Sequence, residues 1–270
     1  MKKIALLTVL FLCVSVSVNA QFLKKLGQKI ENAAEKTIER KAEQKTQKET
    51  EKAFDSAFNK KSKNKKTTSF PSISNVAPKA SYVFSHKAEM QIKSGKEVMD
   101  IAYYLPDSGN FLCAEINDKR IKGKNYTVFD VDREAMFSFI ESEGQKIKIG
   151  VSFKTDESDR EEEKFEITET GKTKIILGYN CKVYKMVGED MTATIWVTKE
   201  VDIRFPSDFY KIKQDKKTNN QWMKDLDGWA MEMVMIDTSK RRPQTITMTC
   251  LSIENSNLKI NSSDYNNIGQ

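Results

Sequence analysis

The stretch that decides the fold is residues 80–105, ASYVFSHKAEMQIKSGKEVMDIAYYL. Its first half alternates apolar and polar side chains, a period of two that is typical of a strand with one buried face. Ser94-Gly95 then supplies a turn, and residues 98–105 supply a second strand, so the stretch predicts an antiparallel hairpin. The side chains on the apolar face of the first strand are Tyr82, Phe84, His86, Ala88, Met90 and Ile92.

The same kind of pattern continues from this hairpin towards the C-terminus. Turn-forming residues separate eight further runs, and only residues 206–228 have the pattern of short helices. We therefore predict a mainly β fold, a single curved antiparallel sheet or half-barrel of about ten strands with short helices, preceded by an N-terminal amphipathic helical arm. The eight runs are residues 111–116, 126–131, 136–140, 147–153, 175–187, 191–198, 229–236 and 245–252.

The N-terminus has the pattern of an export signal. Two lysines precede an apolar run over residues 4–18, and Val18 and Ala20 are small residues at the −3 and −1 positions of a cleavage site. We expect residues 1–20 to be a signal peptide cleaved between Ala20 and Gln21, with the mature protein in the periplasm or outside the cell. Cys13 lies inside the apolar run, which argues against a lipid anchor.

The net charge of +7 belongs to an N-terminal segment. Residues 21–66 hold 14 Lys and Arg against seven Asp and Glu, whereas residues 67–270 hold 29 against 31. The predicted organisation is a basic amphipathic helical arm (21–59), a linker (60–79), a β-domain (80–255) and a loose polar tail (256–270). The linker contains a lysine run, Pro71 and Pro78.

The arm carries a narrow apolar stripe at helical spacing that begins with Leu23, Leu26 and Ile30. Three interpretations fit this stripe: a solvated helix, a helix that self-associates, and a helix that lies on an anionic membrane surface. Nucleic acid is not an expected partner, because export separates the protein from it and no aromatic residues interleave with the lysines.

Two segments carry a family resemblance. Residues 172–181, KTKIILGYNC, and residues 194–198, TIWVT, resemble the signature hairpin of an uncharacterised family of exported bacterial proteins, domain-of-unknown-function family 4412. The resemblance carries over no catalytic residue. It implies a fold similar to the half-barrel of periplasmic lipoprotein carriers (LolA-like), in which a sheet wraps around a helix and holds acyl chains.

One strand face offers a candidate binding surface. Trp229, Met231, Met233 and Met235 share this face, and Met248 lies on the neighbouring strand. Methionine side chains adapt to variable apolar ligands, although an apolar strand face is also what an ordinary core requires.

A second pair of aromatic residues, Tyr179 and Trp196, is expected to lie nearly opposite on one hairpin. The pair would either pack across the strands or stack on a ligand.

Enzyme chemistry has little support in the sequence. The single histidine, His86, excludes every metal site with several histidines, and its place on an apolar strand face predicts a core residue. We therefore expect no catalytic residues, no metal and no cofactor. Beyond the signal peptide the cysteines are Cys113, Cys181 and Cys250, an odd number that allows one disulfide with one thiol, or three buried thiols.

These observations predict a non-enzymatic exported envelope protein that binds an apolar ligand or lipid on the concave face of its sheet. The alternative is an envelope interaction protein whose helical arm contacts a partner or membrane surface and whose sheet holds no ligand.

Overall fold

A computed structural model describes residues 76–267, with gaps at 118–122, 143, 156–164, 207, 214–225 and 240–241. The predicted signal peptide, helical arm and most of the linker lie outside the described residues. Within the described part of the chain, no helix has the length and apolar character needed to cross a membrane.

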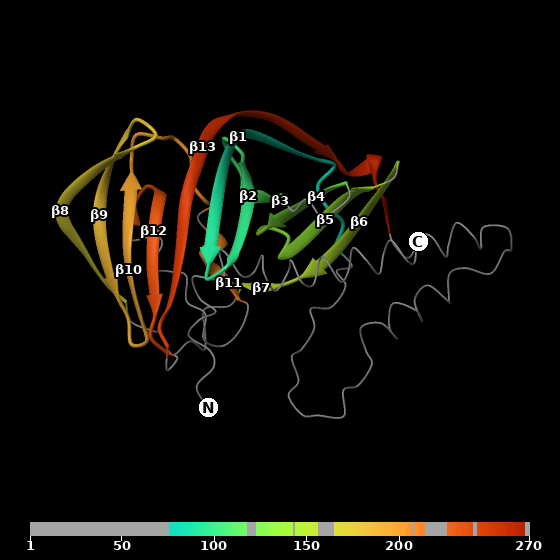
Figure 1. The fold of residues 1–270 in the computed structure, drawn as a ribbon. Coiled ribbons are helices and arrows are strands. Elements are labelled where there is room, and N and C mark those ends of the chain that lie inside the picture. The colour runs from blue at the N-terminus through green and yellow to red at the C-terminus, as the bar shows by residue number, and fades with distance from the viewer. Residues whose placement is uncertain are drawn as a thin grey trace, which may run out of the picture.

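Twelve strands of the described residues form one open, curved sheet, in the order β14-β6-β5-β4-β3-β2-β1-β13-β12-β10-β9-β8 (Figure 1). The predicted mainly β fold on a single curved sheet is confirmed. The sheet is mixed rather than antiparallel throughout, because β14 runs parallel to β6. The strands are β1 Ser81–Ser94, β2 Glu97–Leu105, β3 Phe111–Asn117, β4 Lys124–Asp130, β5 Ala135–Ser142, β6 Gln145–Ser152, β8 Glu166–Ile176, β9 Tyr179–Val187, β10 Met191–Thr198, β12 Trp229–Asp237, β13 Gln244–Asn261 and β14 Asn266–Asn267.

Two smaller features complete the described elements. A two-stranded sheet joins β7 (Lys154–Thr155) to β11 (Ile212–Lys213). The helices of the described residues are the 3-10 turns η2 (Phe209–Lys211) and η4 (Ser262–Asp264). The 3-10 turn η2 lies within residues 206–228, where the sequence predicts short helices. We call residues 201–228 the insertion.

The hairpin predicted from residues 80–105 forms as expected. β1 pairs with β2 from His86 opposite Leu105 to Ser94 opposite Glu97, and Gly95 in the turn adopts a φ of 61°. Met90 and Ile101 face each other across this pair and are both buried. The alternation of the first strand therefore placed Ala88, Met90 and Ile92 correctly on one buried face.

β1 extends beyond β2 and serves two separate cores. Its C-terminal half contributes Ala88, Met90 and Ile92 to the first core, whereas Tyr82 and Phe84 belong to a second core. Register shifts against β13 occur between Phe84 and His86 and between Glu89 and Met90. Such bulges bend and twist a strand pair, and in Figure 1 β13 arches over the top of the molecule towards β3–β6.

The second core lies between this arch and the opposite face of β2–β6. Tyr82, Phe84 and Ile260 of the arch meet side chains of β2–β5 such as Tyr104, Cys113 and Phe137. Because β2 thereby packs on both faces, its last five residues are all buried. A continuous apolar run is the expected sequence of such a strand.

The segment after Asn255 differs from the expected loose tail. β13 continues to Asn261, η4 follows, and β14 pairs with Ile147 and Lys148 of β6. Ile260 and Tyr265 are buried in the second core. Serine and asparagine residues predict loops, but here they occupy exposed or half-buried positions of a strand that buries Ile260.

Candidate functional site

Five of the seven predicted site residues lie together, buried in the first core. On β12, Trp229, Met231, Met233 and Met235 alternate with partly exposed residues. The register places Met233 opposite both Ile195 of β10 and Met248 of β13. The exposed fractions of the five candidate residues are 2% for Trp229, 0% for Met231, 3% for Met233, 1% for Met235 and 5% for Met248. We call these five residues the methionine face.

Part of the insertion covers this face. Phe205 stacks on Trp229 with ring centroids 5.0 Å apart and on Phe209 at 5.5 Å. Tyr103 of β2 meets the same Phe205 ring edge-on at 5.5 Å. The aromatic cover was not predicted, although the clustering of Phe205, Phe209 and Tyr210 beside a proline would have been a usable signal.

The methionine face contains two polar groups of interest. The indole Nε1 of Trp229 is buried beside the Cys250 thiol, a weak acceptor, and no oxygen or nitrogen of the described residues accepts a hydrogen bond from it. Burial raises the pKa of the Cys250 thiol to about 11, against smaller opposing effects of Trp229 and of the Ser252 backbone. At neutral pH the thiol is protonated, so this face offers weak hydrogen-bond donors and no charge.

Trp196 and Tyr179 do not join the methionine face. The residue opposite Trp196 on β9 is Val183, so the predicted near-opposite pairing with Tyr179 is wrong. On its other side Trp196 lies opposite Glu232, a residue between the two inward-facing Met231 and Met233.

Trp196 therefore lies on the same side of the sheet as Glu232, although part of its half-buried side chain packs against the first core. The Lys174 ammonium lies 5.1 Å from its ring centroid and forms an ion pair with Glu232. Tyr179, at the start of β9, is half-buried against the edge of the first core.

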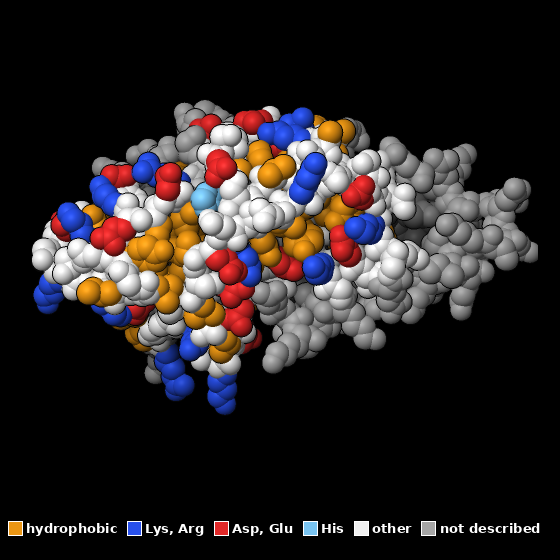
Figure 2. All heavy atoms as spheres, turned by 90° about the horizontal axis from the view of Figure 1, so that it is seen from above, with side chains coloured by type: hydrophobic (Ala, Val, Ile, Leu, Met, Phe, Trp, Pro, Cys, Tyr) orange, Lys and Arg blue, Asp and Glu red, His pale blue; other side chains and the backbone are white. Residues whose placement is uncertain are grey.

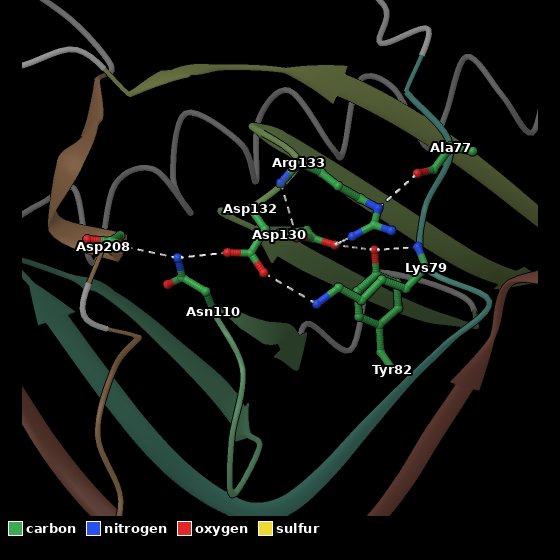
Figure 3. Close-up of polar contacts among 8 residues, drawn as sticks. All are labelled: Ala77, Lys79, Tyr82, Asn110, Asp130, Asp132, Arg133 and Asp208. Carbon is green, nitrogen blue, oxygen red and sulfur yellow. Dashed lines mark hydrogen bonds and ion pairs between the residues drawn. The ribbon is translucent and has the colours of Figure 1, made fainter.

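A cluster of polar residues that the sequence did not predict surrounds the β4–β5 turn (Figure 3). Asp130 has no exposed surface, and its Oδ2 accepts a 2.9 Å hydrogen bond from the Tyr82 hydroxyl. The guanidinium of Arg133 lies 3.4 Å from the same oxygen, and the Arg133 backbone N–H donates to Oδ1 at 3.3 Å. The pKa of the Tyr82 hydroxyl is raised, and burial is the largest cause.

The same cluster joins four parts of the chain. The Asn110 amide donates to Asp132 and to Asp208 of the insertion, each at 3.1 Å. The Lys79 ammonium pairs with Asp132 at 3.6 Å, and Arg133 Nε donates to the Ala77 carbonyl at 3.2 Å. The cluster thus ties the N-terminal entry of the domain to two turns and to the insertion. Among the described residues no group of His, Cys, Asp and Glu is arranged to hold a metal ion.

His86 is not the core residue that its strand position predicts. Its Nε2 lies 2.9 Å from Asp107 Oδ1, and Ser85 Oγ donates to the other oxygen of Asp107 at 2.7 Å. The imidazole side chain is 25% exposed. The hydrogen bond from Ser85 is the largest cause that lowers the pKa of Asp107; desolvation opposes it, and the contact with His86 adds a smaller lowering effect. The contact fastens β1 to the β2–β3 turn where β1 leaves β2.

The structure has free, buried thiols at Cys113, Cys181 and Cys250. Of the two predicted arrangements, three buried thiols is therefore the one observed. Burial raises the pKa of Cys113 and of Cys181 as well. A thiol with a raised pKa is a poor nucleophile at neutral pH.

Comparison with known proteins assigns the family. The sequence model of a domain of unknown function, DUF4412, matches residues 84–263, and the chain belongs to this family. The match does not test the similarity to lipoprotein carriers, which stays a prediction. A search of curated proteins gives no match.

Two solved structures, of PNGF-II in space groups P21 and C2, are similar over 68% of this chain and 30% of theirs. The TM-score is 0.36 and the sequence identity 14% in both cases. This chain spans less than a third of those proteins, and so weak a similarity supports no argument about function.

Proposed function

We propose that this is a non-enzymatic exported envelope protein that binds an apolar ligand, such as the acyl chain of a lipid, on the methionine face. The observation that carries the proposal is the aromatic cover: Phe205 stacks on Trp229, and Phe209 stacks on Phe205, both on a segment outside the twelve-stranded sheet. Only the two residue pairs of β7–β11 anchor that segment by strand pairing among the described residues.

The chemistry of the face fits such a ligand. Unbranched methionine side chains change rotamer at low cost and so can reshape around a chain of variable length. Among the described residues the buried indole Nε1 of Trp229 has only the weakly accepting Cys250 thiol beside it and no oxygen or nitrogen acceptor. A carbonyl oxygen of a lipid ester or fatty acid would satisfy it, and leaving a buried donor unpaired costs about 1–3 kcal/mol.

A second candidate function has its own support. The five residues of the methionine face are at most 5% exposed without any ligand, which also fits a sheet filled by its own core. The protein would then be an envelope interaction protein, with the helical arm as the contact element for a partner or an anionic membrane surface.

The two functions separate in one experiment on purified mature protein. Solvent extraction followed by mass spectrometry should detect acyl species at a fixed ratio to protein if the first function holds. Absence of any co-purifying acyl species would favour the interaction protein.

A matched pair of variants sharpens this experiment. Trp229→Phe keeps the ring stack and removes the buried N–H, so it should lower the amount of retained lipid while unfolding stability changes little. Trp196→Phe makes the same chemical change on the side of the sheet that carries Glu232 and should leave lipid retention unaffected. Equal lipid content in both variants would contradict a role for the indole N–H.

A further inference from the structure

The hairpin that joins β8 to β9 has an unusual turn. Its two central residues, Leu177 and Gly178, have φ values of 53° and 87°. Two-residue hairpin turns with positive φ at both positions are usually Asn-Gly or Asp-Gly, because a branched apolar residue is unfavourable in the left-handed region. Leucine at the first position is therefore a conformational cost to the folded chain.

Packing does not offset this cost. The Leu177 side chain is 50% exposed, and that of Ile175 at 74% is the most exposed large apolar side chain among the described residues. We call Ile175 and Leu177 the apolar tip. Strained, exposed positions that folding does not explain are frequent at binding sites.

Pairing of β8 with a strand of another chain does not account for the apolar tip. β8 is the edge strand of the sheet, but its register is interrupted between Glu169 and Thr173, where Gly171 has a φ of 72°. Bulges and lysines on edge strands disfavour pairing with another chain, and β8 also carries Lys172 and Lys174.

Side chains around the tip give its surroundings a mixed character. Lys172 is exposed, and Tyr179 lies half-buried at the base of the turn. Lysine and tyrosine are amphipathic and favour positions at a membrane–water interface. Figure 2 looks onto this end of the strands and shows apolar side chains on the surface among charged ones.

We infer that the apolar tip inserts into the interfacial region of a lipid bilayer. Two side chains are far too small a surface for a stable protein partner, which needs roughly 800 Å² on each side. Membrane insertion needs no such area, because each apolar side chain that leaves water contributes independently. The inference does not depend on whether the methionine face holds a ligand.

The test is sedimentation of the full mature protein with phosphatidylcholine vesicles at about 0.15 M salt. Neutral vesicles at this salt concentration suppress electrostatic attraction to the basic arm. The unchanged protein should partition to the vesicles, and the combined variant Ile175→Thr, Leu177→Asn should lower the partition coefficient about tenfold or more.

Two controls keep the result interpretable. Asn is favourable in this turn and Ile175 is exposed, so the combined variant should not have a lower thermal midpoint, which excludes misfolding as the cause of weaker binding. Val98→Thr removes another exposed apolar side chain, 58% exposed, at the β1–β2 hairpin and should leave partitioning unchanged. The inference fails if the unchanged protein does not sediment with vesicles, or if the tip variant sediments as well as Val98→Thr does.

Discussion

Tyr82 and Asp130 lie 48 residues apart in sequence, and the tyrosine hydroxyl donates a 2.9 Å hydrogen bond to a carboxylate with no exposed surface. Tyr82 also accepts a hydrogen bond from the backbone N–H of Lys79 at 3.1 Å. A buried carboxylate is tolerated when its oxygens are paired. The contact therefore couples the start of the folded domain to the β4–β5 turn.

Replacing Tyr82 by phenylalanine should destabilise the domain by about 1–3 kcal/mol, because one oxygen of Asp130 loses its hydroxyl donor in a buried site. Urea unfolding of the variant measures this loss. Tyr184→Phe is the matched control: its hydroxyl lies 3.4 Å from Glu169 in an exposed position, so a change within about 0.5 kcal/mol is expected. Equal effects of the two substitutions would show that burial of Asp130 does not matter.

Stability should fall at alkaline pH. Burial raises the pKa of Tyr210 to about 12 and also raises those of Tyr104 and Tyr265. In the unfolded chain these hydroxyls ionise near their ordinary pKa of about 10. Above that pH the unfolded state has released protons that the folded state keeps, so the free energy of unfolding decreases as pH rises. Urea midpoints measured between pH 8 and 11 should decline above about pH 10; a constant midpoint would contradict the burial of these hydroxyls.

A substitution at Met233 distinguishes a solid core from a face that a ligand can enter. Met233→Lys places an unpaired ammonium at a position that is 3% exposed and faces Met248 and Ile195. In a solid core this should cost several kcal/mol or unfold the domain. If the face opens for a ligand, stability should fall only modestly and lipid retention should be lost. Met233→Leu conserves volume and should cost less than about 1.5 kcal/mol; thermal unfolding compares the two variants.

Alanine substitutions at two glycines distinguish the effect of a steric clash from the effect of backbone conformation. Gly123 and Gly144 have similar φ values of 98° and 78°, but a Cβ on Gly123 would lie 2.0 Å from the Glu141 carbonyl oxygen, whereas nothing lies within 4 Å of one on Gly144. Gly144→Ala should cost about 1–2 kcal/mol from its backbone conformation alone. Gly123→Ala should cost clearly more, because β5 backbone has to move. Equal urea midpoints would contradict the close approach at Gly123.

The sequence predicted the parts of this fold that depend on local periodicity. The alternation of β1 and of β12 identified the buried positions, since each strand needs only one apolar face to be recognised. The division of β1 between two cores could not be predicted, because Tyr82 and Ala88 have the same parity and the strand bend depends on bulges in its pairing with β13.

Contacts between turns that lie far apart in the sequence could not be predicted either. His86 has the spacing of a core residue, and its hydrogen bond with Asp107 exists only because Asp107 follows the strand opposite. The alternation of β12 placed Trp229 and three methionines on one buried face, whereas the cover of this face by Phe205 depends on how the insertion folds back over the sheet.

The last prediction concerns the basic arm, which lies outside the described residues. A chain that begins at Ala77 keeps the carbonyl to which Arg133 donates and should retain cooperative unfolding, because the strands of the β-domain pair among themselves. It should also lose attraction to anionic vesicles, an attraction that in the mature protein weakens as salt rises to about 0.15 M and the screening length falls to about 8 Å. Circular dichroism during urea unfolding and vesicle sedimentation at two salt concentrations measure both. Loss of cooperative unfolding would instead mean that the arm packs in the concavity of the sheet as part of the fold.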